Sequence, residues 1–182
     1  VTVYQSKLPF AFSGEGGGFI KFPDGAKWPW ITDQVVPNAW GGYQDAGDWD
    51  RRIQHVAASY LLLDVFEQLP KSTRGMAFNT PASGNVLPHA LYKGKDLPDL
   101  IDEAIWNLDF FRRLQRKDGS VPGGIESGGG PKAWEPCWLE SNTVFAYAPD
   151  PASTYTYAAG AAKLAIVLEI LGETKLSTLY SD

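Results

Sequence analysis

Three amphipathic segments, each long enough for several helical turns, are separated by tracts rich in glycine, proline and aromatic residues. The first segment follows Asp48 and ends at Leu69 and Pro70, the second begins near Asp96, and the third begins at Asp150. No run alternates apolar and polar residues as a half-buried strand does. Loops as long as the intervening tracts are uncommon unless they build a site. The pattern therefore predicts an all-α scaffold whose function resides in its loops.

Capping residues set the predicted helix boundaries. Asp150 is a predicted N-cap with Pro151 at the first helical position, and Gly172 ends that helix. Asp48 is the predicted N-cap of the first helix, and Asp50 falls in its first turn. An alanine-rich face on the third helix would let another helix approach closely. The apolar stripe predicted to face the core in the first helix comprises Ile53, Val56, Ala57, Tyr60, Leu61, Val65 and Phe66.

Length and composition indicate a single domain over residues 1–182, with an irregular lead-in over residues 1–40. The formal net charge of −5 argues against a nucleic-acid partner. No apolar run reaches the length of a membrane span, so no membrane partner is predicted. Val1 to Lys7 lacks the basic and apolar regions of a signal peptide, so the location would be extracytoplasmic only if a signal was removed. Cys137 is the single cysteine and forms no disulfide within the chain.

Residues 41–50 read Gly-Gly-Tyr-Gln-Asp-Ala-Gly-Asp-Trp-Asp and place two carboxylates, Asp45 and Asp48, three residues apart. Three aromatic residues accompany them: Trp40, Tyr43 and Trp49. Sugars stack their flat apolar faces on such rings while carboxylates handle a proton and a water, so the stretch suits glycoside hydrolysis. That reaction needs two well-separated acids on opposite sides of the bond, and this stretch can supply only one of them. A turn followed by an ordinary N-cap explains the same residues about equally well.

Further candidate site residues lie in the tract over residues 119–149. Trp134 and Trp138 sit among prolines and glycines, which favours a sugar-stacking loop over one turn of a core helix. Three glutamates are candidate acids or ligands of sugar hydroxyls, although each alone reads as a solvated charge: Glu126, Glu135 and Glu140. His55 and His89 belong to no His/Cys/Asp cluster at ligand spacing, so neither a metal nor another cofactor is predicted. Phosphate-loop, dinucleotide and nucleophile-elbow motifs are missing as well.

The stretch at residues 41–48 resembles the N-terminal signature of glycoside hydrolase family 9, which reads Gly-Gly-Trp/Tyr-x-Asp-Ala-Gly-Asp. Residues 97–111 look like the Pro-Asp-x-Leu-Asp-Glu helix of that family. The tract over residues 134–141 resembles a family loop with a Trp before a Pro-Glu-Asp, and the helix after Pro151 resembles the family's alanine-rich helix. The resemblance covers roughly residues 40–172, in the same order.

This resemblance implies an (α/α)6 toroid of helical hairpins and inverting hydrolysis of β-glycosidic bonds. Asp48 would be the general base that deprotonates the attacking water, and Asp45 would hold that water and orient Asp48. The substrate-binding residues would be Tyr43, Trp49, Trp134, Trp138 and Glu126. The substrate would be an oligo- or polysaccharide, either a cellulose-like glucan or a glucosaminide, because residues 137–141 lack the family's Pro-Glu-Asp and neighbouring His.

The general acid of the family is a glutamate near the end of its domain, and no glutamate of this sequence has the surrounding motif. A toroid of about 12 helices needs roughly 200 residues before any long loops, so we predict a partial toroid within an incomplete domain. Uncovered apolar helix faces would favour a homo-oligomer. Two alternatives stay open. One is a non-catalytic glycan-binding module that lost the acid, and the other is a partial toroid completed by a partner chain.

Overall fold

A computed structural model describes residues 1–9, 30–44, 49–50, 53–76, 86–127, 135–136 and 139–182. The described chain forms two compact units, and each unit is built from two stretches of sequence. Unit 1 comprises Val1–Ile53 and Phe110–Tyr155, and unit 2 comprises Gln54–Asp109 and Thr156–Asp182. The long helices α4 (Asp99–Leu114) and α5 (Pro151–Ile170) each contribute residues to both units.

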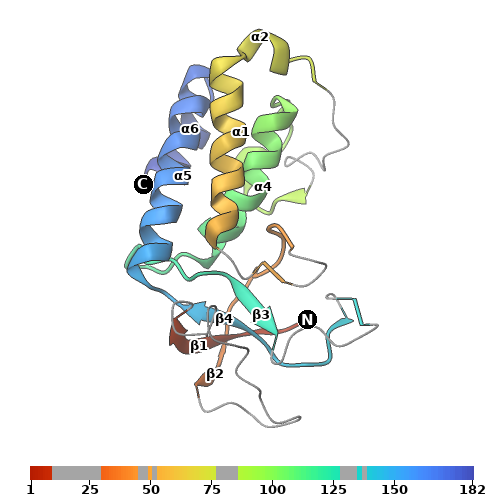
Figure 1. Ribbon diagram of the computed structural model, residues 1–182, viewed down its shortest axis with the longest axis vertical. Coiled ribbons are helices and arrows are strands. Elements are labelled where there is room, and N and C mark those ends of the chain that lie inside the picture. The colour runs from red at the N-terminus through yellow and green to blue at the C-terminus, as the bar shows by residue number, and fades with distance from the viewer. Residues whose placement is uncertain (10–29, 45–48, 51–52, 77–85, 128–134, 137–138) are drawn as a thin grey trace. The chain divides into compact units, whose positions relative to one another are not determined.

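Unit 1 contains a four-stranded mixed sheet with the strand order β2-β1-β4-β3 (Figure 1). The strands are β1 (Val3–Pro9), β2 (Ile31–Val35), β3 (Ile125–Ser127) and β4 (Val144–Ala148). β1 pairs antiparallel with β2 and parallel with β4, and β3 pairs antiparallel with β4. Val144 lies opposite Val3 on one side and opposite Ser127 on the other.

The all-α prediction missed this sheet, and the character of its strands explains why. β4 is buried at four consecutive positions, so its sequence is a continuous apolar run without alternation. β3 has three residues, and the pairing of β1 with β2 shifts register between Tyr4 and Ser6. β1 and β2 also fall within the predicted irregular lead-in, which is therefore wrong at both strands. The part of the lead-in at residues 10–29 lies outside the described residues.

A small aromatic core stabilises this sheet. Ile31, Phe145 and Tyr147 are buried together, and the partly buried Tyr4 and Trp30 pack against them. The rings of Phe145 and Tyr147 have centroids 5.3 Å apart and an interplanar angle of 86°, which is the favourable edge-to-face arrangement. Phe145 and Tyr147 are two positions apart in β4, so both side chains project from the same face of the strand.

Unit 2 is helical and contains α1 (Val56–Gln68), α2 (Pro70–Thr73), the turn η3 (Ala90–Tyr92), α6 (Thr174–Ser181) and most of α4 and α5. Figure 1 shows α1, α4 and α5 running side by side. A Cβ added to Gly160 of α5 would lie 2.6 Å from Cγ1 of Val56 and 2.9 Å from Cδ2 of Leu108. The missing side chain therefore allows α5 to approach α1 and α4 closely. Of the alanines in this helix, Ala161 and Ala165 are buried, whereas Ala158, Ala159 and Ala162 are exposed.

The predicted limits of the third helix are confirmed by α5. Asp150 caps its start, because Oδ1 of Asp150 accepts the N–H of Ser153 at 2.8 Å. At its other end Gly172 has a φ of 79°, and the N–H of Glu173 donates to the carbonyl of Leu168 at 2.8 Å. This is the hydrogen-bond pattern of a glycine-terminated helix. Among the described helices, none is long and apolar enough to cross a membrane.

The start of the first helix differs from the prediction. A 3-10 turn, η2 (Ile53–His55), precedes α1, and α1 itself begins at Val56. Asp50 therefore lies before the helix rather than in its first turn, and His55 occupies the N-cap position. The predicted N-cap Asp48 lies outside the described residues.

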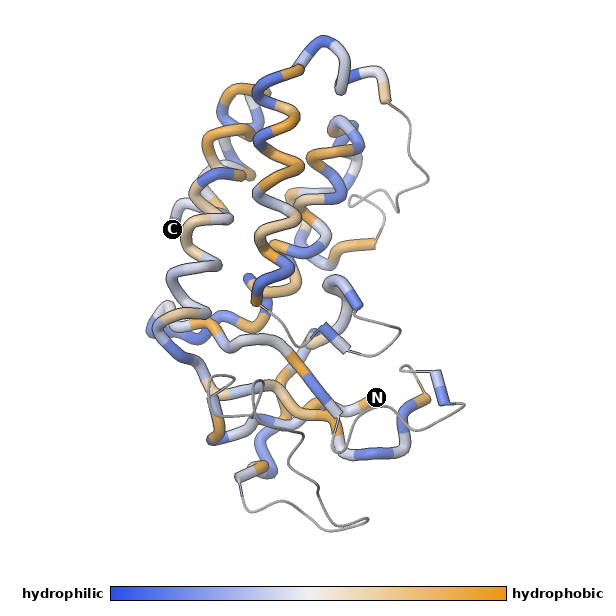
Figure 2. Tube along the Cα trace, in the orientation of Figure 1, coloured by the Kyte–Doolittle hydropathy of each residue, from blue (hydrophilic) through white to orange (hydrophobic). Residues whose placement is uncertain are grey.

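The buried face of α1 also differs from the predicted stripe. Val56 and Phe66 are buried as expected, but Leu61 is 62% exposed and Val65 is 43% exposed. Ser59 and Leu63 take the interior positions instead. Figure 2 shows hydrophobic residues along much of α1, so apolar periodicity could not single out one face.

Candidate functional site

The acidic loop, defined here as residues 43–50, is closed at its base by a hydrogen bond. The N–H of Tyr43 donates to Oδ2 of Asp50 at 2.7 Å, and Asp50 is fully buried. The predicted general base Asp48 and its partner Asp45 lie between these two anchors in sequence, outside the described residues. A hydrogen bond to a buried carboxylate is charge-assisted and strong. Asp50 therefore holds the two ends of the loop together.

The two glycines before the loop have backbone conformations that favour glycine, and Gly42 also packs closely against this carboxylate. Gly41 has a φ of 91° and Gly42 has a φ of 78°, a region that other residues rarely adopt. A Cβ added to Gly42 would lie 2.5 Å from Oδ2 of Asp50 and 2.8 Å from Cδ1 of Phe110. A side chain at residue 42 would therefore displace the anchor of the loop.

A second hydrogen bond of Asp50 ties the acidic loop to the sheet. The backbone carbonyl of Asp50 accepts the N–H of Ile125, the first residue of β3, at 2.8 Å. The next residue is Glu126, one of the predicted substrate-binding residues. Its carboxylate accepts a hydrogen bond from the hydroxyl of Tyr147 on β4. Glu126 thus follows directly after Ile125, the residue bonded to Asp50, and its carboxylate is bound to the buried Tyr147.

Arg113 fixes the segment that leads into the loop. Its guanidinium donates to the carbonyl of Trp40 at 2.8 Å and to the carbonyl of Asn38. The guanidinium carbon also lies 4.4 Å from the centre of the Trp40 ring, within the range of a cation–π contact. Asn38 has a φ of 58°, so the chain turns sharply here. Arg113 near the end of α4 therefore positions the backbone just before Gly41 and Gly42.

The predicted sugar-stacking residues differ in how open they are. Tyr43 is half-buried, whereas Trp49 is 8% exposed and offers little of its ring to a ligand. The buried Nε1 of Trp49 has no hydrogen-bond partner within the described ranges. Trp134 and Trp138 lie outside those ranges, so their sugar-stacking role stays a prediction.

Two other candidate glutamates hold local turns. Glu135 accepts the N–H of Ser141 at 2.9 Å and its hydroxyl at 3.0 Å. Glu140 is buried rather than solvated, contrary to the reading from sequence, and its Oε1 accepts the N–H of Asn142 at 3.0 Å. The other oxygen of Glu140 is buried without a partner in the part of the chain that the structure describes.

The histidines and carboxylates do not combine into a metal site where the structure describes them. Nδ1 of His89 accepts the N–H of Leu91 at 3.3 Å and caps η3. No group of three or more His, Cys, Asp or Glu side chains among the described residues could hold a metal ion.

Sequence reasoning did not identify Asp50 and Arg113 as residues that position the loop. Both act on backbone groups, and such bonds leave no pattern of residue types along the chain. A signal for Asp50 does exist. A Gly-Gly pair followed eight to nine positions later by an aspartate fits a chain that packs directly onto a carboxylate.

Comparison with solved structures places this fold beside endoglucanases of glycoside hydrolase family 9. A single-mutant thermostable endoglucanase from Alicyclobacillus acidocaldarius matches with a TM-score of 0.68 and 19% identity over 100% of this chain and 32% of that chain. AaCel9A in complex with cellobiose-like isofagomine matches with a TM-score of 0.65 and 20% identity over 100% and 32% of the respective chains. Family 9 endoglucanase J30 matches with a TM-score of 0.61 and 23% identity over 81% and 27%.

The chain therefore spans about a third, or less, of the length of these enzymes. No protein-family model matches the sequence, and no curated protein matches it. At identities of 19% to 23% the likeness establishes the fold alone. The chain has the fold of one portion of the family 9 endoglucanases, which makes a glycoside-hydrolase-like function the reading to test.

Proposed function

We propose that this chain is the base-bearing part of an inverting β-glycoside hydrolase and that its helices form a segment of an (α/α)6 toroid. One observation carries the proposal. A fold shared with endoglucanases contains a Gly-Gly-Tyr-Gln-Asp-Ala-Gly-Asp segment in which the N–H of Tyr43 bonds the buried carboxylate of Asp50, two residues after the segment. The bound ligand of AaCel9A is cellobiose-like, so a β-linked glucan is the first substrate class to test.

In this proposal Asp48 removes a proton from a water molecule, and the water oxygen attacks the anomeric carbon. Asp45 accepts a hydrogen bond from the same water and orients Asp48. The bond to the leaving oxygen breaks as the new bond forms on the opposite face of the sugar, so the configuration inverts. The leaving oxygen takes its proton from a second acid. The proposed substrate contacts are Tyr43, Trp134, Trp138 and Glu126, whereas the burial of Trp49 argues against stacking of a sugar on its ring.

Asp50, Gly42 and Arg113 serve this reaction as positioning residues. A base must hold its water within hydrogen-bonding distance and in line with the anomeric carbon, and small displacements cost rate. Tyr43 and Asp50 bracket residues 45–48 in sequence. The carbonyl of Asp50 is bonded to Ile125 of β3, and the carbonyl of Trp40, three residues before Tyr43, is bonded to Arg113 of α4. The arrangement supports a loop whose ends are held before substrate arrives.

Hydrolysis of β-cellobiosyl fluoride isolates the role of the base, because fluoride departs without being protonated and needs no general acid. We expect the chain to release fluoride and Asp48→Asn to release it about 10²- to 10⁴-fold more slowly. Asp96→Asn is the matched control, since Asp96 is an exposed aspartate of unit 2. NMR should detect the α-anomer as the first product.

Equal rates for the native chain and Asp48→Asn would rule out Asp48 as the base. Retention of configuration would rule out the inverting mechanism. Binding of cellotetraose without any release of fluoride would favour the alternative of a non-catalytic glycan-binding module.

A further inference from the structure

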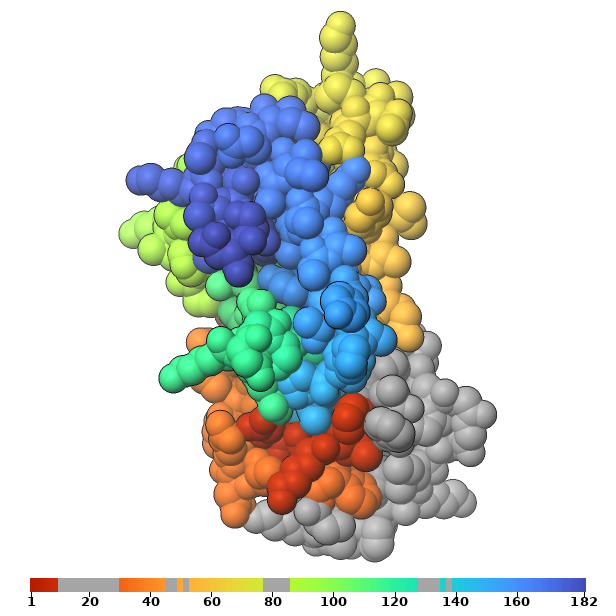
Figure 3. All heavy atoms as spheres, turned by 90° about the vertical axis from the view of Figure 1, so that its left-hand side faces the viewer, coloured from red at the N-terminus to blue at the C-terminus, as the bar shows by residue number. Residues whose placement is uncertain are grey.

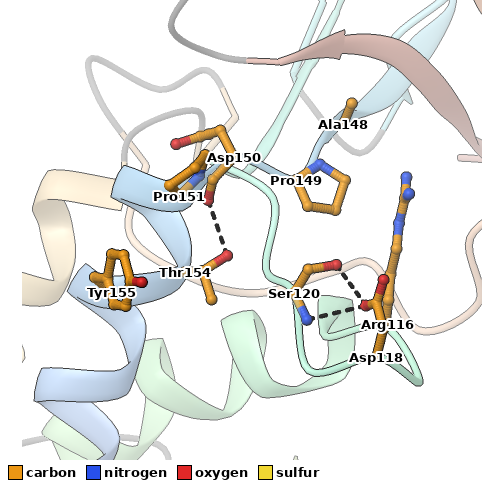
Figure 4. Close-up of a pocket in the computed structure, with 9 residues that line it drawn as sticks. All are labelled: Arg116, Asp118, Ser120, Ala148, Pro149, Asp150, Pro151, Thr154 and Tyr155. Carbon is orange, nitrogen blue, oxygen red and sulfur yellow. Dashed lines mark hydrogen bonds between the residues drawn. The ribbon is translucent and has the colours of Figure 1, made fainter.

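An open pocket of about 510 Å³ lies in unit 1, and we name it the α5 pocket (Figure 4). Three segments line it: the turn after α4, the end of β4 and the first turn of α5. In Figure 3 the teal segment after α4 and the blue start of α5 meet on the face toward the viewer. The volume lies within the range of small-molecule sites. None of the lining residues belongs to the acidic loop.

The floor of the α5 pocket is held by hydrogen bonds. The hydroxyl of Thr154 donates to the carbonyl of Asp150 at 2.8 Å and accepts the N–H of Val121 at 3.1 Å. The Asp150 carboxylate accepts the N–H and the hydroxyl of Ser153 at 2.8 and 2.7 Å. These bonds join the start of α5 to the segment after α4, so the pocket is largely formed before a ligand enters.

One wall of the pocket carries opposite charges side by side. Oδ1 of Asp118 accepts the hydroxyl of Ser120 at 2.6 Å and its N–H at 3.1 Å. These two bonds lower the pKa of Asp118, which is therefore ionised at neutral pH. Both use Oδ1 and leave Oδ2 as a further acceptor. Arg116 lines the same wall with a planar guanidinium; Nη1 and Nη2 lie against the side-chain amide of Gln5, and the remaining N–H groups are donors for a ligand.

The other wall is an aromatic platform. Tyr155 projects from the first turn of α5 and is 76% exposed, the largest exposed fraction among the large hydrophobic residues that the structure describes. Pro149 and Pro151 add apolar rings to the lining. In the view of Figure 4, Tyr155 lies on the opposite side of the pocket from Arg116 and Asp118. An aromatic ring thus lies on one side of the pocket and two charged groups lie on the other.

This combination of groups selects a neutral, hydroxyl-rich ligand. A small anion would meet the carboxylates of Asp118 and Asp150, and a small cation would meet the guanidinium of Arg116. Hydroxyl groups both donate and accept, so they satisfy a carboxylate and a guanidinium together. The C–H face of a sugar ring covers a tyrosine ring.

We propose that the α5 pocket binds a sugar unit of a neutral glucan chain, with Tyr155 stacked on the sugar and Arg116 and Asp118 bonded to its hydroxyls. The geometry supports the sugar, whereas the choice of a β-glucan rests on the proposed function. The pocket would hold the chain of a polysaccharide without taking part in its cleavage.

The test is a titration of the ¹⁵N-labelled chain with cellotetraose, followed through the amide resonances of Ser120, Val121 and Thr154. We expect saturable shifts at these amides with a Kd on the order of 1 mM. Loss of the stacked ring in Tyr155→Ala should raise that Kd about tenfold, which corresponds to about 1.4 kcal/mol. Tyr155→Phe keeps the ring and is the matched variant, with a Kd within about twofold of the native value. Because Tyr155 is exposed, neither substitution removes core packing.

Three outcomes would overturn the proposal: an unchanged Kd in Tyr155→Ala, shifts confined to Gly42, Tyr43 and Trp49, or pocket shifts with inorganic phosphate but not with cellotetraose. The same titration in Asp48→Asn separates this proposal from the proposed function. Pocket shifts should persist in that variant whether or not it hydrolyses the fluoride substrate.

Discussion

Replacing Gly42 with alanine tests whether packing against Asp50 holds the acidic loop. The added Cβ would lie 2.5 Å from Oδ2 of Asp50 and 2.8 Å from Cδ1 of Phe110, so both neighbours must move. A φ of 78° costs an alanine about 1–2 kcal/mol, and the overpacking costs about 1–3 kcal/mol more. Withdrawal of the carboxylate would also break its bond to Tyr43, worth about 1.5–3 kcal/mol. The last two costs overlap, so we expect Gly42→Ala to lower the free energy of unfolding by about 3–5 kcal/mol.

Gly119→Ala is the matched control for this substitution. Gly119 belongs to the same unit and has a φ of 84°, but no atom lies within 4 Å of its added Cβ. It should therefore lose only the backbone contribution of about 1–2 kcal/mol. Urea unfolding followed by circular dichroism would compare the two variants, and amide hydrogen exchange would report on Tyr43. Equal losses of stability, with the Tyr43 amide still protected in Gly42→Ala, would refute the packing argument.

Two further predictions concern unit 2. The buried hydroxyl of Tyr92 donates to Asp109 at 2.9 Å and lies 2.5 Å from the hydroxyl of Tyr180. Urea unfolding should show that Tyr92→Phe lowers the free energy of unfolding by about 2–4 kcal/mol and Tyr180→Phe by about 1–2 kcal/mol. The first loss is larger because only Tyr92→Phe takes a donor from a buried carboxylate. Equal losses would contradict this reasoning. Hydrogen bonds to the carboxylates of Asp64 and Glu67 on α1 raise the pKa of Lys163. The contribution of Lys163 to stability is therefore complete below the ordinary lysine pKa of about 10.4 and is lost as the pH rises further. The stability difference between the native chain and Lys163→Met should therefore be flat from about pH 7 to 10 and shrink above it, and a constant difference up to about pH 12 would contradict the assignment.

The helices could be predicted where local signals define them. A cap acts within four residues of the helix end that it satisfies. The sequence therefore shows both limits of α5 locally, the start at Asp150 and Pro151 and the end before Gly172. The sheet depends on partners that are remote in sequence. β1 pairs with β4 more than a hundred positions away, and a short strand buried on both faces has the same apolar run as a helix core.

The sequence motif of the candidate site could be predicted, but the contacts that hold it in place could not. The glycines, carboxylates and aromatic rings of residues 41–50 are adjacent in sequence, so their chemistry can be read directly. Their supports come from elsewhere: Arg113 from the end of α4 and the N–H of Ile125 from β3. Contacts from a side chain to a distant backbone group require the tertiary fold, which periodicity and capping do not specify.

The two bonds of Asp50 also limit how the acidic loop can vary in length. Its carboxylate accepts the N–H of Tyr43, seven positions earlier, and its carbonyl accepts the N–H of Ile125. One residue therefore fixes the end of the loop and its position on the sheet. Substitutions between the anchors change side chains while the ends stay in place. A residue inserted or deleted next to Tyr43 or Asp50 would displace the bonded group by about 3.3–3.8 Å along the chain, which is further than a hydrogen bond tolerates. Libraries that redesign the acidic loop should therefore keep Tyr43, Asp50 and their immediate neighbours and vary the residues between them.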